Sequence, residues 1–429
     1  MSKRRGRARR LAALLGAALV SAGCASIPAR SSHDGPTSVT TAPSTRSGLA
    51  PLRRHVSVPR PAFSLRSIGH VFVIVLENES EQNAFGYPDA DPYLARTLRR
   101  EGLFLPDYYA IGHYSADNYI ALVSGQPPNE STQDDCGTFV PFATPRVLPG
   151  GIQAGDGCVY PRAIANIGTE LSAAGRSWKA YEQDMGERPS REPAACAHPA
   201  IGAPDRTENA VRGDGYTTRH DPFVYFASVI SRRGYCDAHV IALGSPQGSM
   251  PKAALRGETG LFDDLRSVRT TPSFSFITPD LCSDGHDYPC VNRRSGQSAF
   301  ADVDSFLRSW VPIIEASAAF RRDGLLVITF DEAAGGEGAS ASCCGERPDP
   351  GAIPPVPPGI DGPGGGRVGA VLISPFIRRR TVDKTDYNHY SMLATFEDIF
   401  GLHRLGFSAL TPPIPAAALG SNLDPSGAR

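Results

Sequence analysis

The chain has 429 residues, of which 41% are hydrophobic, so it is long and apolar enough to bury a large core. Its 43 Lys and Arg residues nearly balance its 44 Asp and Glu residues. Because general nucleic-acid binders carry a basic face that neutralises phosphates, this balance argues against nucleic acid as a partner.

Residues 1–24 have the pattern of an export signal. Six basic residues lie within the first ten positions, an apolar run follows over Leu11–Val20, and small residues precede Cys24. The apolar run is too short to span a bilayer. The ending Ala22-Gly23-Cys24 resembles a lipoprotein box, so we expect either a lipid anchor at Cys24 or free secretion, with the twin-arginine route open through Arg9-Arg10. Without this segment, 37 basic residues remain against 44 acidic ones, and the exported chain is net acidic.

Eight further cysteines follow the signal. An even number of cysteines in an exported chain predicts up to four disulfides, because export leads to an oxidising compartment. We expect Cys282 to pair with Cys290, which would pin the short acidic loop between them. Cys343 and Cys344 are adjacent, so we expect them to have separate partners. Zinc is the alternative ligand of these cysteines, although no Cys-x-x-Cys spacing occurs.

The chain divides into a tether and one domain after the signal. Residues 25–66 are rich in Ser, Thr, Pro and Arg without apolar periodicity, which predicts a flexible tether. Residues 67–429 are long for a single domain but acceptable for an α/β fold with insertions. The insertions are expected at 126–161 and 189–214, where loop-forming residues dominate.

Short apolar runs rich in β-branched residues alternate with helical patterns across this domain. The alternation is typical of a mostly parallel sheet that helices cover on both faces. The predicted strands are Val71–Leu76, Ser273–Ile277, Leu325–Phe330 and Val368–Ile373. Apolar residues at helical spacing predict a helix over Val303–Ile314.

Acidic residues follow three of these strands. They are Glu77-Asn78, Asp331-Glu332, and the group Asp280, Asp284, His286 and Asp287. Because ligands bind at the carboxyl ends of the strands in open α/β sheets, we expect these side chains to converge there. Convergent carboxylates repel one another unless a cation lies among them, so the pattern predicts a divalent metal ion. Each group taken singly has a simpler interpretation as a helix cap or a solvated loop.

Ser115 stands between a loop and a helix predicted over Asp117–Ser124. Free backbone N–H groups and the helix dipole attract phosphate at such a junction, and a nearby metal would make the hydroxyl a usable nucleophile. Asn118 follows three residues later on the same face, where it could donate to a phosphoryl oxygen. The simpler interpretation makes Ser115 the N-cap of the helix.

The segment His113–Leu122 reads His-Tyr-Ser-Ala-Asp-Asn-Tyr-Ile-Ala-Leu and resembles the His-Pro-Ser-x-x-Asn-Tyr-x-Ala-Leu motif of the bacterial phosphoesterase family. That family holds secreted acid phosphatases and non-haemolytic phospholipases C, and it belongs to the alkaline phosphatase superfamily. Other segments are similar to further motifs of the family, in the same order: Glu77–Ser80, Arg219–Phe223, Pro279–Asp287, Phe330–Glu332, Gly365–Val368, Asn388–Ser391 and Glu397–Leu402. The resemblance implies an alkaline phosphatase-like, three-layer α/β sandwich.

The resemblance also implies roles for individual residues. The metal ligands would be Glu77, Asn78, Ser115, Asp331 and Glu332, and Ser115 would also be the nucleophile. The catalytic partners of Ser115 would be His113, Asn118 and His286. The substrate-binding residues would be Asp284, His220 and His389, and a second metal ion among these groups stays open. For His220, the simpler interpretation is a capping or core histidine.

Two positions depart from the family pattern. Tyr114 stands where the family has Pro, which leaves the backbone before the nucleophile less restrained. Asp280 stands where the family commonly has Asn, and it adds an acid near the site.

The implied activity is metal-dependent hydrolysis of a phosphorylated small molecule or phospholipid through a phosphoserine at Ser115. An acid phosphatase acting on monoesters is favoured, because the phospholipases of the family usually have Thr as the nucleophile. The alternatives are a phospholipase C-type phosphodiesterase and a non-catalytic envelope protein that binds a phosphorylated ligand. Oxygen ligands suit Ca²⁺, Mg²⁺ or Mn²⁺, whereas the histidines suit Zn²⁺, so the identity of the metal stays open. Nothing in the sequence predicts the oligomeric state.

Overall fold

The computed structural model describes residues 63–89, 91–291, 298–334, 338–345 and 362–421. The predicted export signal, with Cys24, lies outside the described residues, and so does nearly all of the predicted tether. The described chain starts at Phe63, whose ring lies 5.3 Å from that of Phe376. Packing against the core therefore begins slightly before residue 67, the predicted domain boundary. Among the described residues as a whole, no helix has both the length and the apolar composition that are needed to cross a bilayer.

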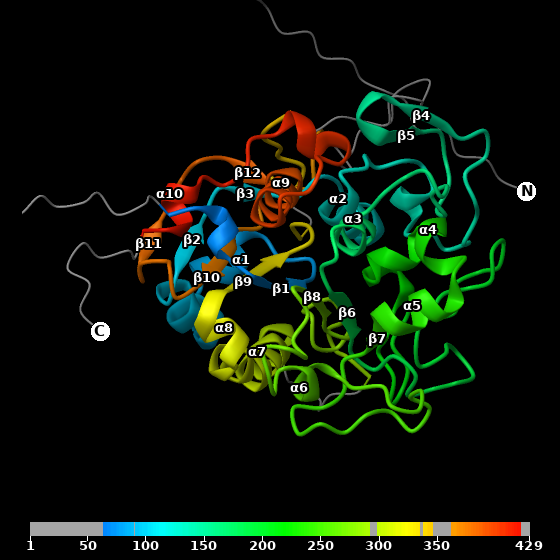
Figure 1. Ribbon diagram of the computed structural model, residues 1–429, viewed down its shortest axis with the longest axis horizontal. Helices are drawn as coiled ribbons and strands as arrows, with labels where there is room; N and C mark the ends of the chain where they lie inside the picture. The colour runs from blue at the N-terminus through cyan, green and yellow to red at the C-terminus, as the bar shows by residue number, and fades with distance from the viewer. Residues whose placement is uncertain (1–62, 90, 292–297, 335–337, 346–361, 422–429) are drawn as a thin grey trace, which may run out of the picture. The chain divides into compact units, whose positions relative to one another are not determined.

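An eight-stranded sheet lies at the centre of the described fold, in the order β11-β2-β10-β9-β1-β8-β6-β7 (Figure 1). Its strands are β1 (His70–Leu76), β2 (Leu103–Leu105), β6 (Trp178–Glu182), β7 (Val240–Ala242), β8 (Phe274–Thr278), β9 (Gly324–Phe330), β10 (Ala370–Ile373) and β11 (Thr381–Val382). In this sheet only β10 runs antiparallel to its neighbours. Two small ladders join β3 (Tyr108–Tyr109) to β12 (Tyr387–Asn388) and β4 (Arg146–Leu148) to β5 (Ile152–Ala154).

Helices cover both faces of this sheet. Figure 1 shows α2, α3 and α9 on one face and α7 and α8 on the other. The α-helices are α1 (Glu81–Gly86), α2 (Ser115–Ser124), α3 (Ile167–Ala173), α4 (Ala227–Ile230), α5 (Arg233–His239), α6 (Leu261–Asp264), α7 (Ala299–Ala316), α8 (Ala318–Asp323), α9 (His389–Phe400) and α10 (Ala416–Leu419). The predicted α/β architecture, with a mostly parallel sheet between two helical layers, is confirmed.

The three predicted strands at the centre of the sheet form within one residue of their predicted bounds. β1, β8 and β9 are buried along their whole length, which explains why their sequences are apolar without alternation. The fourth predicted strand begins at Ala370 instead of Val368, because Gly369 has a φ of 73° that an extended strand does not accept. Helix α7 extends the predicted helix at both ends, and Ser298 caps it by accepting a hydrogen bond from the backbone of Ala301.

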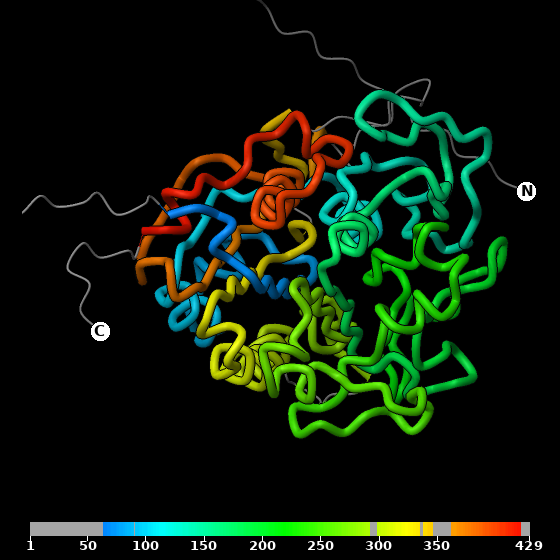
Figure 2. Tube along the Cα trace, viewed as in Figure 1, coloured from blue at the N-terminus to red at the C-terminus, as the bar shows by residue number. Residues whose placement is uncertain are grey.

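Both predicted insertions are poor in regular structure. Figure 2 shows that the trace of 126–161 and 189–214, in cyan to green, follows a largely irregular path, and few of these residues belong to helices or strands. Only short elements interrupt the first, including β4 and β5. The predicted insertions are therefore confirmed as loop-rich segments.

The register between β1 and β9 sets the position of the polar side chains. The two strands are parallel, and Leu76 is the direct partner of Phe330. Glu77 and Asp331 therefore follow at the same level of the carboxyl edge. The segment after β8 approaches from the other side of β1, where the carbonyl of Asp284 accepts a hydrogen bond from the backbone of Glu77 at 2.9 Å. The three acidic segments meet at this edge, as the sequence predicted.

Four disulfides occur in the described fold: Cys136–Cys158, Cys196–Cys236, Cys282–Cys290 and Cys343–Cys344. The predicted pairing of Cys282 with Cys290 is confirmed. The expectation of separate partners for Cys343 and Cys344 is wrong, because the other six cysteines pair among themselves and these two neighbours bond to each other. Four disulfides indicate folding in an oxidising compartment, which agrees with export.

Candidate active site

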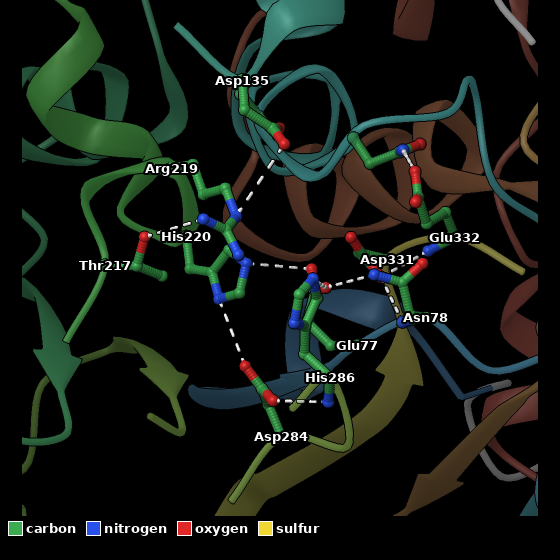
Figure 3. A network of polar contacts seen from close by, with 12 residues as sticks. Glu77, Asn78, Asp135, Thr217, Arg219, His220, Asp284, His286, Asp331 and Glu332 are labelled. Carbon is green, nitrogen blue, oxygen red and sulfur yellow. Dashed lines mark hydrogen bonds and ion pairs between the residues drawn. The ribbon is translucent and has the colours of Figure 1, made fainter. Parts of the chain in front are cut away.

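Glu77 follows β1 directly, is fully buried, and stands at the centre of a polar network (Figure 3). Its Oε1 atom lies 3.1 Å from Nε2 of His220, and its Oε2 atom accepts a hydrogen bond from Nδ2 of Asn78 at 2.8 Å. Nε2 of His286 lies 4.0 Å from Oε2. Burial raises the pKa of Glu77, but attraction to His220 and hydrogen bonds from Asp331 and His220 outweigh it and hold the pKa well below its usual range. Glu77 is therefore an anion at neutral pH.

His220, at the end of the short 3₁₀ helix η6 (Thr218–His220), bridges two carboxylates. Its Nδ1 atom lies 3.3 Å from Oδ2 of Asp284, opposite the contact with Glu77. The ring stacks on Tyr119 of α2, with 4.9 Å between centroids and 3° between planes. Burial lowers the pKa of His220, but the two neighbouring carboxylates raise it above its ordinary value. His220 thus lies among the acids of the site, as predicted, and is not an isolated core histidine.

Asp284 and His286 enter from the loop after β8, which the Cys282–Cys290 disulfide closes. Oδ1 of Asp284 accepts a hydrogen bond from the backbone of His286 at 2.8 Å. Burial raises the pKa of Asp284 to about 6 although His220 opposes the shift. Burial lowers the pKa of His286, yet the hydrogen bond with Asp287 at 2.8 Å and the charge of Glu77 bring it to about 9. The His286 side chain is 33% exposed, so a cation stands at the rim of the network.

Asp331 and Glu332 follow β9 directly. Oδ1 of Asp331 accepts hydrogen bonds from the backbone of Asn78 at 3.0 Å and of Glu332 at 2.6 Å. Its Oδ2 atom is buried and receives no hydrogen bond from a donor in the described residues. Burial, and then contact with the carboxylate of Glu77, raise the pKa of Asp331 well above its usual range. Two carboxyl groups in such contact need a proton or a cation between them.

Glu332 faces the loop before α2. Nδ1 of His113 lies 3.7 Å from its Oε1 atom, and Nδ2 of Asn118 lies 3.4 Å from its Oε2 atom. Burial raises the pKa of Glu332 to about 7, and His113 opposes this shift. Nε2 of His113 donates to the carbonyl of Ala339 at 2.7 Å. The predicted residues His113 and Asn118 therefore come together with Glu332 on the same side of the site.

Ser115 is the first residue of α2 and is 2% exposed. It is not the N-cap, because Tyr114 occupies that position without a side-chain hydrogen bond. The next backbone N–H, that of Ala116, donates to Oδ1 of Asp135 at 3.0 Å. The helix start is thus capped by an acid from the 126–161 insertion, which leaves the hydroxyl of Ser115 out of the capping role.

Tyr114 has a φ of 86°, which proline, locked near −65°, cannot adopt. The departure from the family motif therefore changes the backbone before Ser115. Nδ2 of Asn118 donates to the carbonyls of Gly112 at 2.8 Å and Tyr114 at 3.1 Å, and its Oδ1 accepts from the backbone of Ile111 and Gly112. The loop is held firmly, contrary to the expected loss of restraint. Because both ends of the Asn118 amide are engaged, its donation to a phosphoryl oxygen stays a prediction.

His389, the first residue of α9, is buried beside Asp331. Its Nε2 atom donates to the carbonyl of Asp331 at 2.7 Å, and its Nδ1 atom accepts from the hydroxyl of Tyr108 at 2.9 Å. Burial lowers the pKa of His389 to about 4. Both ring nitrogens are bound within the chain, so this residue holds Asp331 in place, and its role in substrate binding stays a prediction.

Asp280, the second departure from the family pattern, is paired with another acid. Its Oδ1 atom accepts a hydrogen bond from the backbone of Cys282 at 3.0 Å. Burial, and then the contact with Asp280, raise the pKa of Asp184 to about 8. The added acid is therefore compensated by a proton on a neighbouring carboxyl group.

Asp135 and Arg219 belong to the same network, but neither was predicted to be a site residue. Nε of Arg219 lies 3.9 Å from Oδ2 of Asp135. Figure 3 marks this ion pair with a dashed line. Asp135 reaches the site only through the tertiary fold of an insertion loop next to the Cys136–Cys158 disulfide. A signal for Arg219 was available, since it precedes His220 inside a family motif.

The donor set at the strand edge fits a divalent cation by its chemistry. Glu77 and Asp331 bring two buried carboxyl groups into contact, and Oδ2 of Asp331 receives no hydrogen bond from the described residues. Hard cations such as Ca²⁺ and Mg²⁺ prefer such oxygen ligands. In the described part of the chain, however, no three His, Cys, Asp or Glu side chains stand around one point at metal-binding distance. The residues therefore fit a divalent cation by the chemistry of their oxygen atoms and not by a preformed cage.

Residues 88–403 match the model of the Phosphoesterase family. The chain belongs to this family. Proteins similar to it include the phosphatidylinositol-3-phosphatase of Mycobacterium tuberculosis, with 24% identity over 82% of this chain and 84% of that protein. The phosphate-repressible acid phosphatase of Penicillium chrysogenum is 24% identical over 72% of this chain and 54% of its own length. The chain spans about half the length of this fungal relative.

As a phosphoesterase, the protein is a hydrolase that acts on phosphoric ester bonds. Among solved structures, a protein of the alkaline phosphatase superfamily from Vibrio parahaemolyticus is similar, with 14% identity and a TM-score of 0.45 over 78% of this chain and 67% of that chain.

Proposed function

We propose that the protein is a metal-dependent phosphomonoesterase that forms a phosphoserine at Ser115. The observation that carries this proposal is the contact between the buried carboxyl groups of Glu77 and Asp331, next to the helix that begins with Ser115. Glu332 links the two regions, because it follows Asp331 and contacts His113 and Asn118 in the segment around Ser115.

The residues of the chain have separate tasks in this proposal. Glu77, Asn78, Asp331, Glu332 and Ser115 would hold a divalent cation, which when bound supplies positive charge for the phosphoryl oxygens and activates the hydroxyl. The Ser115 oxygen attacks phosphorus, the bond to the alcohol breaks, and water then hydrolyses the phosphoserine. His220 fixes Glu77 and Asp284, and His389 fixes Asp331.

A hollow of about 470 Å³ opens beside this cluster. It lies next to Ala333, which follows Glu332, and its wall carries the polar side chains of Ser80, Asn83, Tyr109 and Arg367. These groups suit the hydrophilic alcohol part of a phosphate ester. A phosphorylated polyol or the head group of a phospholipid monoester fits this surface, and the name of the mycobacterial relative makes phosphatidylinositol 3-phosphate the first lipid to test.

The decisive experiment is Ser115→Ala, assayed with p-nitrophenyl phosphate. We expect turnover to disappear while the fold is retained, and we expect a phosphate adduct on the wild-type peptide that contains Ser115 after rapid acid quench. Ser124→Ala is the matched control, because Ser124 lies in the same helix and its hydroxyl bonds the carbonyl of Ile120 and the backbone N–H of Gln126, away from the acidic cluster. Unchanged turnover in Ser115→Ala would exclude the proposed nucleophile.

A substrate panel separates the remaining alternatives. A phosphomonoesterase prefers p-nitrophenyl phosphate, whereas a phospholipase C-type enzyme prefers phosphodiesters such as phosphatidylcholine. A non-catalytic binding protein would retain phosphate ligands without hydrolysing any of them. Mass spectrometry of the mature N-terminus would show whether the exported protein carries lipid at Cys24 or is released.

A further inference from the structure

Arg219 is a buried cation whose hydrogen-bonding capacity the chain leaves partly unused. The residue is 6% exposed. One terminal nitrogen donates to the carbonyl of Glu208 at 2.6 Å and lies 3.4 Å from the hydroxyl of Thr217. The Nε–H group meets no acceptor at hydrogen-bond distance among the described residues. Asp135 balances the charge of the guanidinium, but the Nε–H donor itself has no acceptor. Because a buried donor without an acceptor is costly, it points to an acceptor atom from outside the chain, and an anionic one suits a cation.

Asp135 connects this free donor to the start of α2. Its Oδ2 atom lies 3.9 Å from Nε of Arg219, too far for a hydrogen bond. Its Oδ1 atom accepts from the backbone of Ala116, the residue after Ser115. One carboxylate therefore places the guanidinium next to a helix N-terminus, where the positive end of the helix dipole attracts a phosphate.

The many acidic groups of the site are a second reason to expect that a cationic side chain contacts the substrate. Carboxyl groups of Glu77, Asp284, Asp331 and Glu332 are all buried there. A phosphate monoester arrives as a dianion and would be repelled by them. Figure 3 shows Arg219 beside His220, on the side of the network that faces Asp135. A planar guanidinium matches the oxygens of a phosphate better than any other side chain.

We propose that Arg219 donates from Nε to a non-bridging phosphoryl oxygen, and that Asp135 holds the guanidinium ready until substrate arrives. This inference rests on the proposed function, because it places the phosphoryl group at Ser115. The proposed contact also implies a preference for phosphate monoesters over diesters. A monoester presents one more negative charge than a diester, so Arg219 stabilises monoesters more and favours them as substrates.

The test compares Arg219→Gln and Arg219→Lys with the wild type, using p-nitrophenyl phosphate and bis-p-nitrophenyl phosphate. Losing one charge-assisted bond should lower kcat/KM for the monoester by about 10–100-fold. The diester should lose clearly less, and the inhibition constant of inorganic phosphate should rise by a similar factor of about 10–100. Arg219→Lys should restore part of the loss, since it keeps the charge without the fork.

Arg191→Gln is the matched control, because Arg191 forms a partly buried ion pair with Asp214 at 2.7 Å. We expect it to lower stability without changing the inhibition constant of phosphate. Equal losses for monoester and diester, with unchanged inhibition by phosphate, would reduce Arg219 to a structural role and overturn the inference. That result is distinct from failure of the proposed function, in which Ser115→Ala would keep its activity.

If Arg219→Gln does not fold, Asp135→Asn tests the proposed contact between Arg219 and the phosphoryl group instead. Asparagine keeps an acceptor for Ala116 but removes the charge that competes with phosphate for Arg219. We expect phosphate to inhibit this variant at a several-fold lower concentration. Weaker or unchanged inhibition would contradict the proposed partnership of Arg219 with the phosphoryl group.

Discussion

Nε2 of His220 lies 3.1 Å from Oε1 of Glu77, and Nδ1 of the same ring lies 3.3 Å from Oδ2 of Asp284. The two carboxylates come from segments after different strands, so one imidazolium ring ties β1 to the loop after β8. All three side chains are buried. The two contacts therefore hold these segments of the site together and also compensate the charges of the carboxylates.

We predict that His220→Ala destabilises the fold and impairs hydrolysis. Removing one partner from a buried charge pair costs about 3–5 kcal/mol, because the remaining charges lose their compensation. Urea unfolding should show a lower midpoint, and hydrolysis of p-nitrophenyl phosphate should fall. The matched control is His403→Ala, since His403 is 96% exposed and contacts Glu170 only at the surface. Equal stability of the two variants would refute a bridging role for His220.

A second prediction concerns metal removal. Dialysis against a chelator should abolish hydrolysis, and adding back the native divalent cation should restore it. Isothermal titration should show that Asp331→Asn binds this cation at least about tenfold more weakly, because a ligand with a free buried oxygen loses its charge. Asp264→Asn is the control, since Asp264 pairs with Lys179 elsewhere. Full activity after chelation, with no metal found by elemental analysis, would disprove metal dependence.

A third prediction tests the backbone before Ser115, the proposed nucleophile. Tyr114→Pro cannot reproduce a φ of 86°, so the loop must rearrange and kcat/KM should fall by about 100-fold or more. Tyr114→Gly accepts this conformation without strain and should change the free energy of unfolding by no more than about 1 kcal/mol. The comparison is informative because both variants remove the same exposed ring. Similar activity in the two would show that this φ is irrelevant to catalysis.

A fourth prediction concerns pH and lies outside the site. Burial, and then contact with the carboxyl group of Asp304, raise the pKa of Asp91 from 3.8 to about 7. The folded state therefore retains a proton that the unfolded state releases near pH 4. Its contribution to stability is fully present below the unfolded pKa and is lost as the pH rises through about 7.

Asp91→Asn removes this titration, so it should raise the free energy of unfolding at pH 8 by roughly 1–3 kcal/mol and have little effect at pH 4. Thermal unfolding between pH 4 and pH 8 measures the difference. Asp89→Asn serves as the control, because the Asp89 side chain is 90% exposed. A pH profile unchanged by Asp91→Asn would show that the proton is held elsewhere.

The central strands of the fold could be predicted because local sequence patterns specify them. β1 and β9 are continuous apolar runs buried on both faces, and each ends directly in an acid. The direction of β10 could not be predicted, since an antiparallel strand at this place has the same composition as a parallel one.

The rest of the site depends on contacts between distant segments. Asp135 reaches the start of α2 through an insertion loop, and no local pattern shows where such a loop ends. The bond between Cys343 and Cys344 was missed for another reason. Adjacent cysteines seldom have the geometry to pair, so spacing alone argued for separate partners.

Every residue of α2 is buried, from Ser115 to Ser124. No face of this helix is exposed to solvent, so every substitution in it alters the packing of the interior. Ser115, the proposed nucleophile, therefore belongs to a buried helix whose nine other residues can change only together with their neighbours. We therefore expect new substrate specificities to arise through changes in the surrounding loops, such as 126–161, while the sequence of α2 is retained.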